Sequence, residues 1–297
     1  MWENTILVVV DTAAGAHQPA LERAAWLAKQ SQGRLELFTC EWDPDVDAGR
    51  VDPDARDTLL EQRQGKLDEL AVPLRQQGIS VSVDVVWDHP LDVAILNKAG
   101  AHDYWLVAKD TQHHNLAQRT LLTNVDWLLI RKCPVPLLLV KDRKLATDPV
   151  VLAAVDPTNE HDKPAALDER IYTFAAELAR TLRGHLHVVH SYGTPLGAEL
   201  PPAAVKVIAD EHRAAMKRFL DTHAALEGRP HLYEGMAHEC LQKAAKEHAA
   251  DFVVMGAVAR RGLTRLFIGS TAERVLDRLP CDLVIIKPLE FEAPDGD

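Results

Sequence analysis

The sequence has few cysteines, and their spacing gives them no shared role. Cys40, Cys133, Cys240 and Cys281 lie far apart, without a Cys-x-x-Cys pair or zinc-finger spacing. A disulfide framework and a structural zinc site are therefore not expected, and we interpret all four side chains as buried thiols.

Positive charge is also in short supply. The chain has 33 Lys and Arg against 44 Asp and Glu, a net charge of −11, which argues against nucleic acid or an anionic membrane as main partner. The apolar run before Asp11 is short and follows no basic segment, so it predicts neither a signal peptide nor a membrane span. We expect a soluble cytoplasmic protein, and 297 residues with 47% apolar side chains suffice for two domains.

Several catalytic and nucleotide motifs are missing as well. Leu263 follows Gly262 where a P-loop needs lysine, and the first strand of neither half is followed by G-x-G-x-x-G. There is no G-x-S-x-G hydrolase elbow either. No residue set supplies an evident nucleophile and base, so we predict no catalytic residue and no enzyme.

Histidine, in contrast, is abundant, with its densest cluster in HLHVVH at 185–190. On a strand, side chains alternate, so His185 and His187 face one way and His190 the other. These three cannot converge on one ion. We therefore interpret them as solvated or packed side chains and predict no metal site.

The chain repeats itself. Apolar runs ending in aspartate, helix–Gly–strand junctions, and the starts of a fourth and a fifth strand recur in the same order. The paired landmarks are Asp11 and Asp156 (offset 145), Gly33 and Gly184 (151), Asp103 and Asp251 (148), and Pro134 and Pro280 (146). A near-constant offset over four landmarks indicates a duplicated domain rather than a solenoid.

Within each copy, short β-branched runs alternate with helical stretches, which predicts parallel sheets covered on both faces. The expected strands are 5–10, 34–40, 80–86, 104–108 and 136–140, then 150–155, 185–190, 230–234, 251–256 and 282–286. The fold class is thus α/β, with two tandem doubly wound five-stranded domains over 1–143 and 150–290. We expect them to pack as an intrachain pseudo-dimer, with a further dimer left open.

A glycine-rich stretch, MGAVARRGLTRLFIGSTAERV at 255–275, lies in the second copy. Ser270-x-x-Glu273 is typical of a capping box, which predicts a helix start near Ser270. Free N–H groups at such a start, reached across glycines, suit an anion such as phosphate. In the alternative, the glycines only close a turn and Ser270 only caps. Because ligands of such sheets sit at the carboxyl ends of strands, Asp156 should lie beside Met255 and Gly256.

On these residues the sequence resembles the universal stress protein family, in particular its tandem two-domain branch. The resemblance covers nearly the whole chain and implies the adenine nucleotide alpha hydrolase-like fold. Nucleotide-binding members carry G-x2-G-x9-G-[ST], matched here at Gly256, Gly269 and Ser270, with Ala259 at the second glycine. The resemblance implies ATP as cofactor, held by Asp156, Met255, Gly256, Val258, Ala259, Gly269, Ser270 and Thr271.

The first copy departs from that motif. An alignment at an offset of 147 residues, close to that of Asp103 and Asp251, puts Lys109, Gln112, Leu122 and Thr123 in place of Gly256, Ala259, Gly269 and Ser270. A stretch without glycine does not let a phosphate approach the backbone, so ATP is expected in the second domain only. Thr123-x-x-Asp126 predicts that the helix cap survives, and Lys109 is expected to pair with Asp11.

The functional prediction is a non-catalytic stress-response regulator that binds an adenine nucleotide. One alternative is a slow ATPase in which Asp156 orients a metal-bound nucleotide. Another is a nucleotide-independent scaffold or carrier of a different small or apolar ligand. The sequence does not name client proteins.

Overall fold

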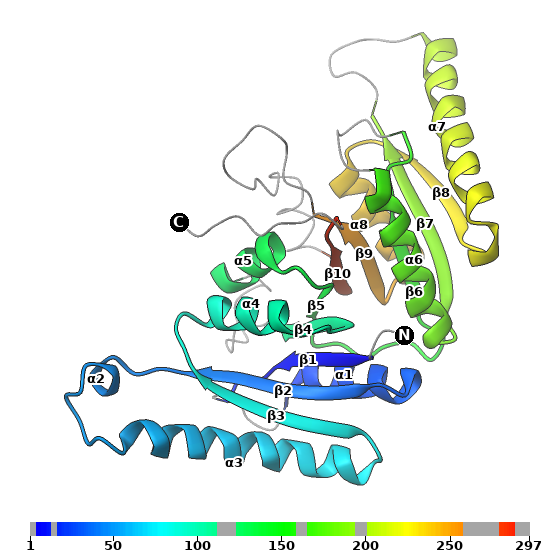
Figure 1. Cartoon of the computed structure of the whole chain (residues 1–297). Helices are drawn as coiled ribbons and strands as arrows, with labels where there is room; N and C mark the ends of the chain where they lie inside the picture. The colour runs from blue at the N-terminus through cyan, green and yellow to red at the C-terminus, as the bar shows by residue number, and fades with distance from the viewer. Residues whose placement is uncertain are drawn as a thin grey trace. The chain divides into compact units, whose positions relative to one another are not determined.

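The computed structural model describes residues 4–12, 17–111, 123–158, 165–193, 201–257 and 279–288. The chain divides into two compact units, one built from residues 1–142 and the other from 143–291 (Figure 1). Each unit is a separate α/β body. The packing of the two units as a pseudo-dimer stays a prediction.

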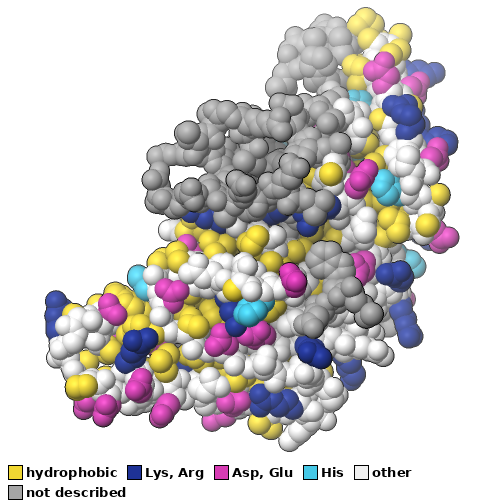
Figure 2. Space-filling model, viewed as in Figure 1, with side chains coloured by type: hydrophobic (Ala, Val, Ile, Leu, Met, Phe, Trp, Pro, Cys, Tyr) yellow, Lys and Arg dark blue, Asp and Glu magenta, His cyan; other side chains and the backbone are white. Residues whose placement is uncertain are grey.

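The first unit has five parallel strands in the order β3-β2-β1-β4-β5. Its elements are β1 (Thr5–Val9), α1 (Pro19–Ser31), β2 (Arg34–Glu41), α2 (Pro44–Asp47), α3 (Ala55–Gln76), β3 (Ser80–Trp87), α4 (Leu91–Ala101), β4 (Leu106–Asp110), α5 (Asn124–Lys132) and β5 (Leu137–Val140). The long helix α3 packs against β2 and β3. Figure 2 shows acidic and basic side chains interspersed on the visible face of this unit.

The second unit repeats this order as β10-β9-β6-β7-β8, again with parallel pairs. Its elements are β6 (Val150–Ala154), α6 (Ala165–Thr181), β7 (His185–Tyr192), α7 (Pro202–Thr222), the 3-10 turn η1 (Ala224–Leu226), β8 (Arg229–Glu234), α8 (Ala237–Glu247), β9 (Phe252–Gly256) and β10 (Asp282–Ile286). All ten predicted strands are thus confirmed, and so is the doubly wound fold class.

The helices that connect the parallel strands pack on the sheet of each unit. In the second unit α6 packs on β6, β7, β9 and β10, while α7 packs on β7 and β8 and α8 on β7. The central strands are accordingly apolar and buried; Val151, Leu152 and Ala153 of β6 are fully covered. In the described part of the chain, no helix has the length and hydropathy that a bilayer crossing requires.

Gly33 and Gly184 form the same helix–strand junction in the two units. A Cβ on Gly33 would lie 2.3 Å from the carbonyl oxygen of Asn4, and one on Gly184 would lie 2.1 Å from that of Pro149. The residue after each glycine donates its N–H to the same carbonyl, at 2.8 Å. Only glycine permits this close approach of the second strand to the start of the first.

A buried carboxylate fixes the start of the second unit. Asp251 is fully covered, and it accepts hydrogen bonds from Arg143 Nη2 (2.9 Å) and from the N–H groups of Ala146 (3.2 Å) and Val150 (3.1 Å). The repeat had paired Asp251 with Asp103, but Asp103 is exposed. By strand pairing, the counterpart of Asp251 is Trp105, since each donates its N–H to the first residue of the neighbouring strand.

We predict that Asp251→Ala lowers the free energy of unfolding by about 2–4 kcal/mol, because it removes a buried acceptor from two backbone N–H groups and an arginine. Urea denaturation followed by circular dichroism measures the change. Asp103→Ala is the matched control and should cost less than about 0.5 kcal/mol. Equal losses in both variants would contradict this role of Asp251.

Candidate functional site

The second unit has its topological switch point between β6 and β9, where the strand order reverses. Asp156 follows the end of β6, and Met255 and Gly256 are the last residues of β9. The expected juxtaposition of these three residues at the carboxyl edge is therefore correct. Val258, Ala259, Gly269, Ser270 and Thr271 lie outside the described residues, so the glycine loop and its cap stay predictions.

Hydrogen bonds hold the Asp156 segment in place. Its carboxylate accepts from Thr158 Oγ1 at 2.8 Å, and its N–H donates to Asp168 Oδ1 on α6 at 3.1 Å. The Asp156 side chain is 14% exposed. A carboxylate oriented in this way can accept hydrogen bonds from ligand hydroxyl groups.

Two buried histidines, His190 and His212, lie next to the Asp156 segment. His190 Nδ1 is 3.2 Å from the carbonyl oxygen of Val155 and 3.9 Å from Asp156 Oδ1. His190 Nε2 lies 2.8 Å from Nδ1 of His212 on α7, and Tyr192 stacks on His212. Because a carbonyl oxygen only accepts, Nδ1 of a neutral His190 carries the proton and its Nε2 accepts from His212. The pair thus braces the strand end that carries Asp156.

Gly256 has a packing role besides its place in the motif. A Cβ at this position would lie 2.7 Å from Leu167 Cδ2 and 3.1 Å from Ile171 Cδ1. Leu167 is fully buried, so its side chain would have to shift to admit a larger residue at the end of β9. The absence of a side chain at Gly256 therefore lets α6 pack closely against this strand end.

The strand registers of the two units show which residues correspond. The N–H of Thr111 donates to the last residue of β5, and that of Ala257 to the last residue of β10, both at 3.1 Å. Asp110 therefore occupies the position of Gly256. The predicted exchange of Gly256 for Lys109 is wrong by one residue, because it uses an offset of 147 residues where the strand registers give 146.

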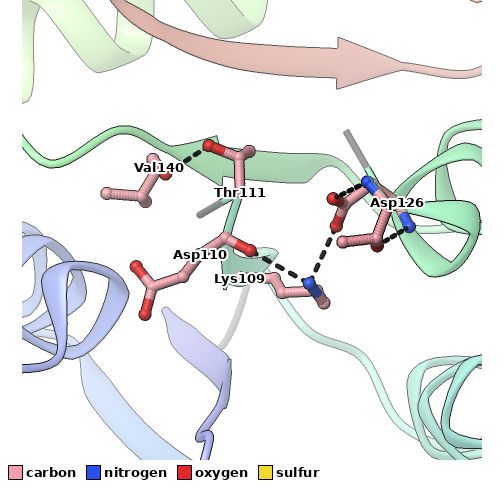
Figure 3. A network of polar contacts seen from close by, with 6 residues as sticks. Lys109, Asp110, Thr111, Asp126 and Val140 are labelled. Carbon is pink, nitrogen blue, oxygen red and sulfur yellow. Dashed lines mark hydrogen bonds and ion pairs between the residues drawn. The ribbon is translucent and has the colours of Figure 1, made fainter. Parts of the chain in front are cut away.

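Lys109 instead belongs to the helix cap of the first unit (Figure 3). Its ammonium group lies 2.8 Å from Asp126 Oδ1 and 2.9 Å from the carbonyl oxygen of Asp110. Asp126 also closes the capping box with Thr123 at the start of α5, which confirms the predicted cap. The expected pairing of Lys109 with Asp11 is wrong, since Asp126 is the ion-pair partner.

The carboxylate of Asp110 binds the start of α1. Its Oδ1 accepts the N–H of Ala20 in the first helical turn at 2.7 Å. Burial raises the pKa of Asp110 to about 6, with Asp11 adding to the rise and Lys109 and His17 opposing it. At neutral pH the first unit therefore places its own negative charge at the carboxyl edge, where it repels an incoming phosphate.

We predict that the Asp110 carboxyl group makes the stability of the protein depend on pH. The folded state binds the Asp110 proton more tightly than the unfolded chain, so the free energy of unfolding falls as pH rises from about 4 to about 6. Asp110→Asn keeps the acceptor for Ala20 and should reduce this fall by about 1–3 kcal/mol. Urea denaturation across this pH range measures it. Asp103→Asn serves as control; a profile of Asp110→Asn that matches wild type would refute the assignment.

The two units therefore define a duplicated α/β protein with doubly wound parallel sheets, an acidic residue after the first strand and a switch point beside the fourth. The model of the universal stress protein family matches residues 3–141 and 150–287. The chain belongs to this family, and it carries the family's domain twice.

Full-length relatives agree with this assignment. The chain is 33% identical to universal stress protein E of Salmonella typhi over 99% of its length and 97% of that protein. A structure of a protein of unknown function from Pseudomonas aeruginosa PAO1 aligns with a TM-score of 0.76 at 30% identity, covering 97% of this chain and 93% of that one. A universal stress protein from Archaeoglobus fulgidus shares the fold at a TM-score of 0.69 and 19% identity, over 97% and 99% of the two chains.

Sequence reasoning missed several residues around the switch points. Asp168 and His212 reach residues in or just after the second unit's strands because helices bring them there, and Asp110 reaches the start of α1 from the end of β4. For His212 and Asp168 a weak signal existed, since each is a polar residue in an otherwise apolar helical stripe. Asp110 gave a stronger one, because it directly follows a buried strand as Asp11 does.

Proposed function

We propose that the chain is a cytoplasmic, non-catalytic stress-response protein whose second unit binds an adenine nucleotide. The relatives that cover nearly its whole length are named universal stress proteins. The ligand would lie at the carboxyl ends of β6 and β9, between Asp156 and the glycine loop. Client proteins would read the bound state.

The exchange of Gly256 for Asp110 at one register position carries this proposal. In the first unit the Asp110 carboxylate accepts the N–H of Ala20 at the start of α1 and places a negative charge at the carboxyl edge of the sheet. In the second unit the equivalent position has neither side chain nor charge, and the adjoining wall is formed by Leu167 and Ile171. A polyphosphate is therefore repelled from the first edge but not by Gly256 in the second.

Roles for the individual ligand contacts follow from this geometry. Asp156 would accept from the ribose or the adenine, and Met255 and Val258 would surround the base. Gly256, Ala259 and Gly269 would bring the backbone close to the phosphates, with Ser270 and Thr271 offering N–H groups of the helix start. Nothing in this set acts as an evident nucleophile with a base.

We predict at most one ATP per chain. Ala259→Gly should tighten binding by about 5–150-fold, which corresponds to relief of about 1–3 kcal/mol of backbone strain. Gly269→Leu, which copies Leu122 of the first unit, should eliminate binding by blocking the phosphates. Isothermal titration calorimetry of the full chain measures both the affinity and the stoichiometry.

Gly65→Leu is the matched control, because Gly65 lies in α3 with no atom within 4 Å of an added Cβ. It should bind ATP like wild type. Two sites per chain, or unchanged binding in Gly269→Leu, would mean that the glycine loop is only a turn.

We also predict no catalysis beyond the level of the slowest regulatory nucleotide hydrolases, roughly 10⁻⁴ to 10⁻² s⁻¹. Release of ADP or AMP from ATP and magnesium is the assay. Sustained turnover of roughly several per second that disappears in Asp156→Asn would contradict a non-catalytic protein. That variant keeps an acceptor for Thr158, so the strand end should retain its fold.

A further inference from the structure

Three histidines of the second unit converge at the edge of the sheet opposite the proposed nucleotide site. His187 lies on β7, His231 on β8, and His248 directly follows α8. One potential ligand atom from each lies within 4.8 Å of those of the other two. The cluster sits toward the amino ends of the strands, since β9 starts four residues after His248.

Strand register and helix packing produce this convergence. His187 pairs with Arg229 across β7 and β8, so His231, two residues on, is its diagonal neighbour on the same face. The helix α8 packs against β7 and delivers His248 at its end. The prediction that no ion could be bound considered His185, His187 and His190 alone; the alternation is real, but His187 gains partners from other elements.

The distances are close to those of a coordinated metal. His187 Nδ1 and His231 Nε2 are 2.9 Å apart and share one proton. Two nitrogens bound to a tetrahedral Zn²⁺ at 2.0–2.1 Å would be about 3.3 Å apart. A metal ion can therefore replace that proton once this pair moves apart by a few tenths of an ångström and the third nitrogen, up to 4.8 Å from the others, moves closer by up to about 1.5 Å. The His248 ring centroid lies 4.7 Å from that of His187 and 4.0 Å from that of His231.

Outer hydrogen bonds orient the third ring. The Tyr233 hydroxyl donates to Glu247 Oε2 at 2.7 Å and lies 3.2 Å from His248 Nε2. Lys243 covers the face of the Tyr233 ring at 5.6 Å. A carboxylate that holds a ligand ring through an intervening group is a frequent feature of metal sites.

Charge and exposure suit a bound cation. A ring without a proton on its ligand nitrogen offers a lone pair to a metal ion. Among the charged groups nearby, Arg229 opposes a cation, while Glu247 favours it. His231 and His248 are partly exposed, which gives an ion a route from solvent.

We propose that His187, His231 and His248 form a site for one divalent transition-metal ion of the Zn²⁺ type. Imidazole nitrogen is a preferred ligand of this class of ions. Three protein ligands leave the fourth tetrahedral position to water or to a group from a partner. The site is independent of the proposed nucleotide site, which lies at the opposite edge of the sheet.

The test titrates Zn²⁺ into the full chain without a polyhistidine tag and follows binding by calorimetry. One equivalent should bind. His231→Gln and His248→Gln should each weaken binding by more than about 100-fold, and Tyr233→Phe by about 10–100-fold, the range for an outer-shell partner. Zn²⁺ should raise the melting temperature of wild type but not of the two ligand variants.

His185→Gln is the matched control, since His185 is an exposed histidine of the same strand. It should bind Zn²⁺ like wild type. Substituting Co²⁺ separates nitrogen from cysteine ligation by its absorption spectrum. Failure of wild type to bind, wild-type affinity in both ligand variants, or a thiolate spectrum would each overturn the proposal. The two substituted histidines are partly exposed, so their variants stay informative even if His187→Gln does not fold.

Discussion

Parallel pairing of strands that are distant in sequence is the constraint on which the rest of this protein depends. β1 pairs with β4 and β6 with β9, so residues that follow two separate strands meet at one edge. The crossover helices connect the parallel strands, and Gly33 and Gly184 allow the adjacent strands to approach closely. Asp156 and Gly256 become neighbours for this reason alone. The hydrogen bonds of Asp156 with Thr158, which donates, and with Asp168, which accepts, then refine a position that the sheet has set.

The same constraint explains how two copies of one fold acquire different chemistry. At one register position the first unit has Asp110 and the second has Gly256. The side-chain carboxylate of Asp110 is itself an anion at this edge, and it accepts the N–H of Ala20. The helix cap of Thr123 and Asp126 is retained, because it stabilises α5 without any ligand. Structure can thus persist where the proposed binding function is lost.

The amino edge of the second unit has its own polar chemistry. Asp251 holds the chain entering β6, and the histidine cluster lies where β7, β8 and the end of α8 meet. Asp251 is buried and hydrogen-bonded, whereas His231 and His248 are partly exposed, so these groups avoid the cost of an unpaired buried polar group. If a metal ion binds there, it would tie α8 to the sheet at the edge away from the nucleotide.

By itself the sequence determined the ten strands and the cap at Thr123, which depend on local periodicity or on residues a few positions apart, and the duplication, which shows in landmarks repeated along the chain. The place of Asp156 followed from the strand order typical of such a sheet. Only the tertiary structure decided that Asp110 replaces Gly256, that Asp126 receives Lys109, and that His187 meets His231 and His248. Alternation along a strand fixes which face a side chain takes. It leaves open the register against the neighbouring strand, which hydrogen bonding and helix packing set across the whole sheet.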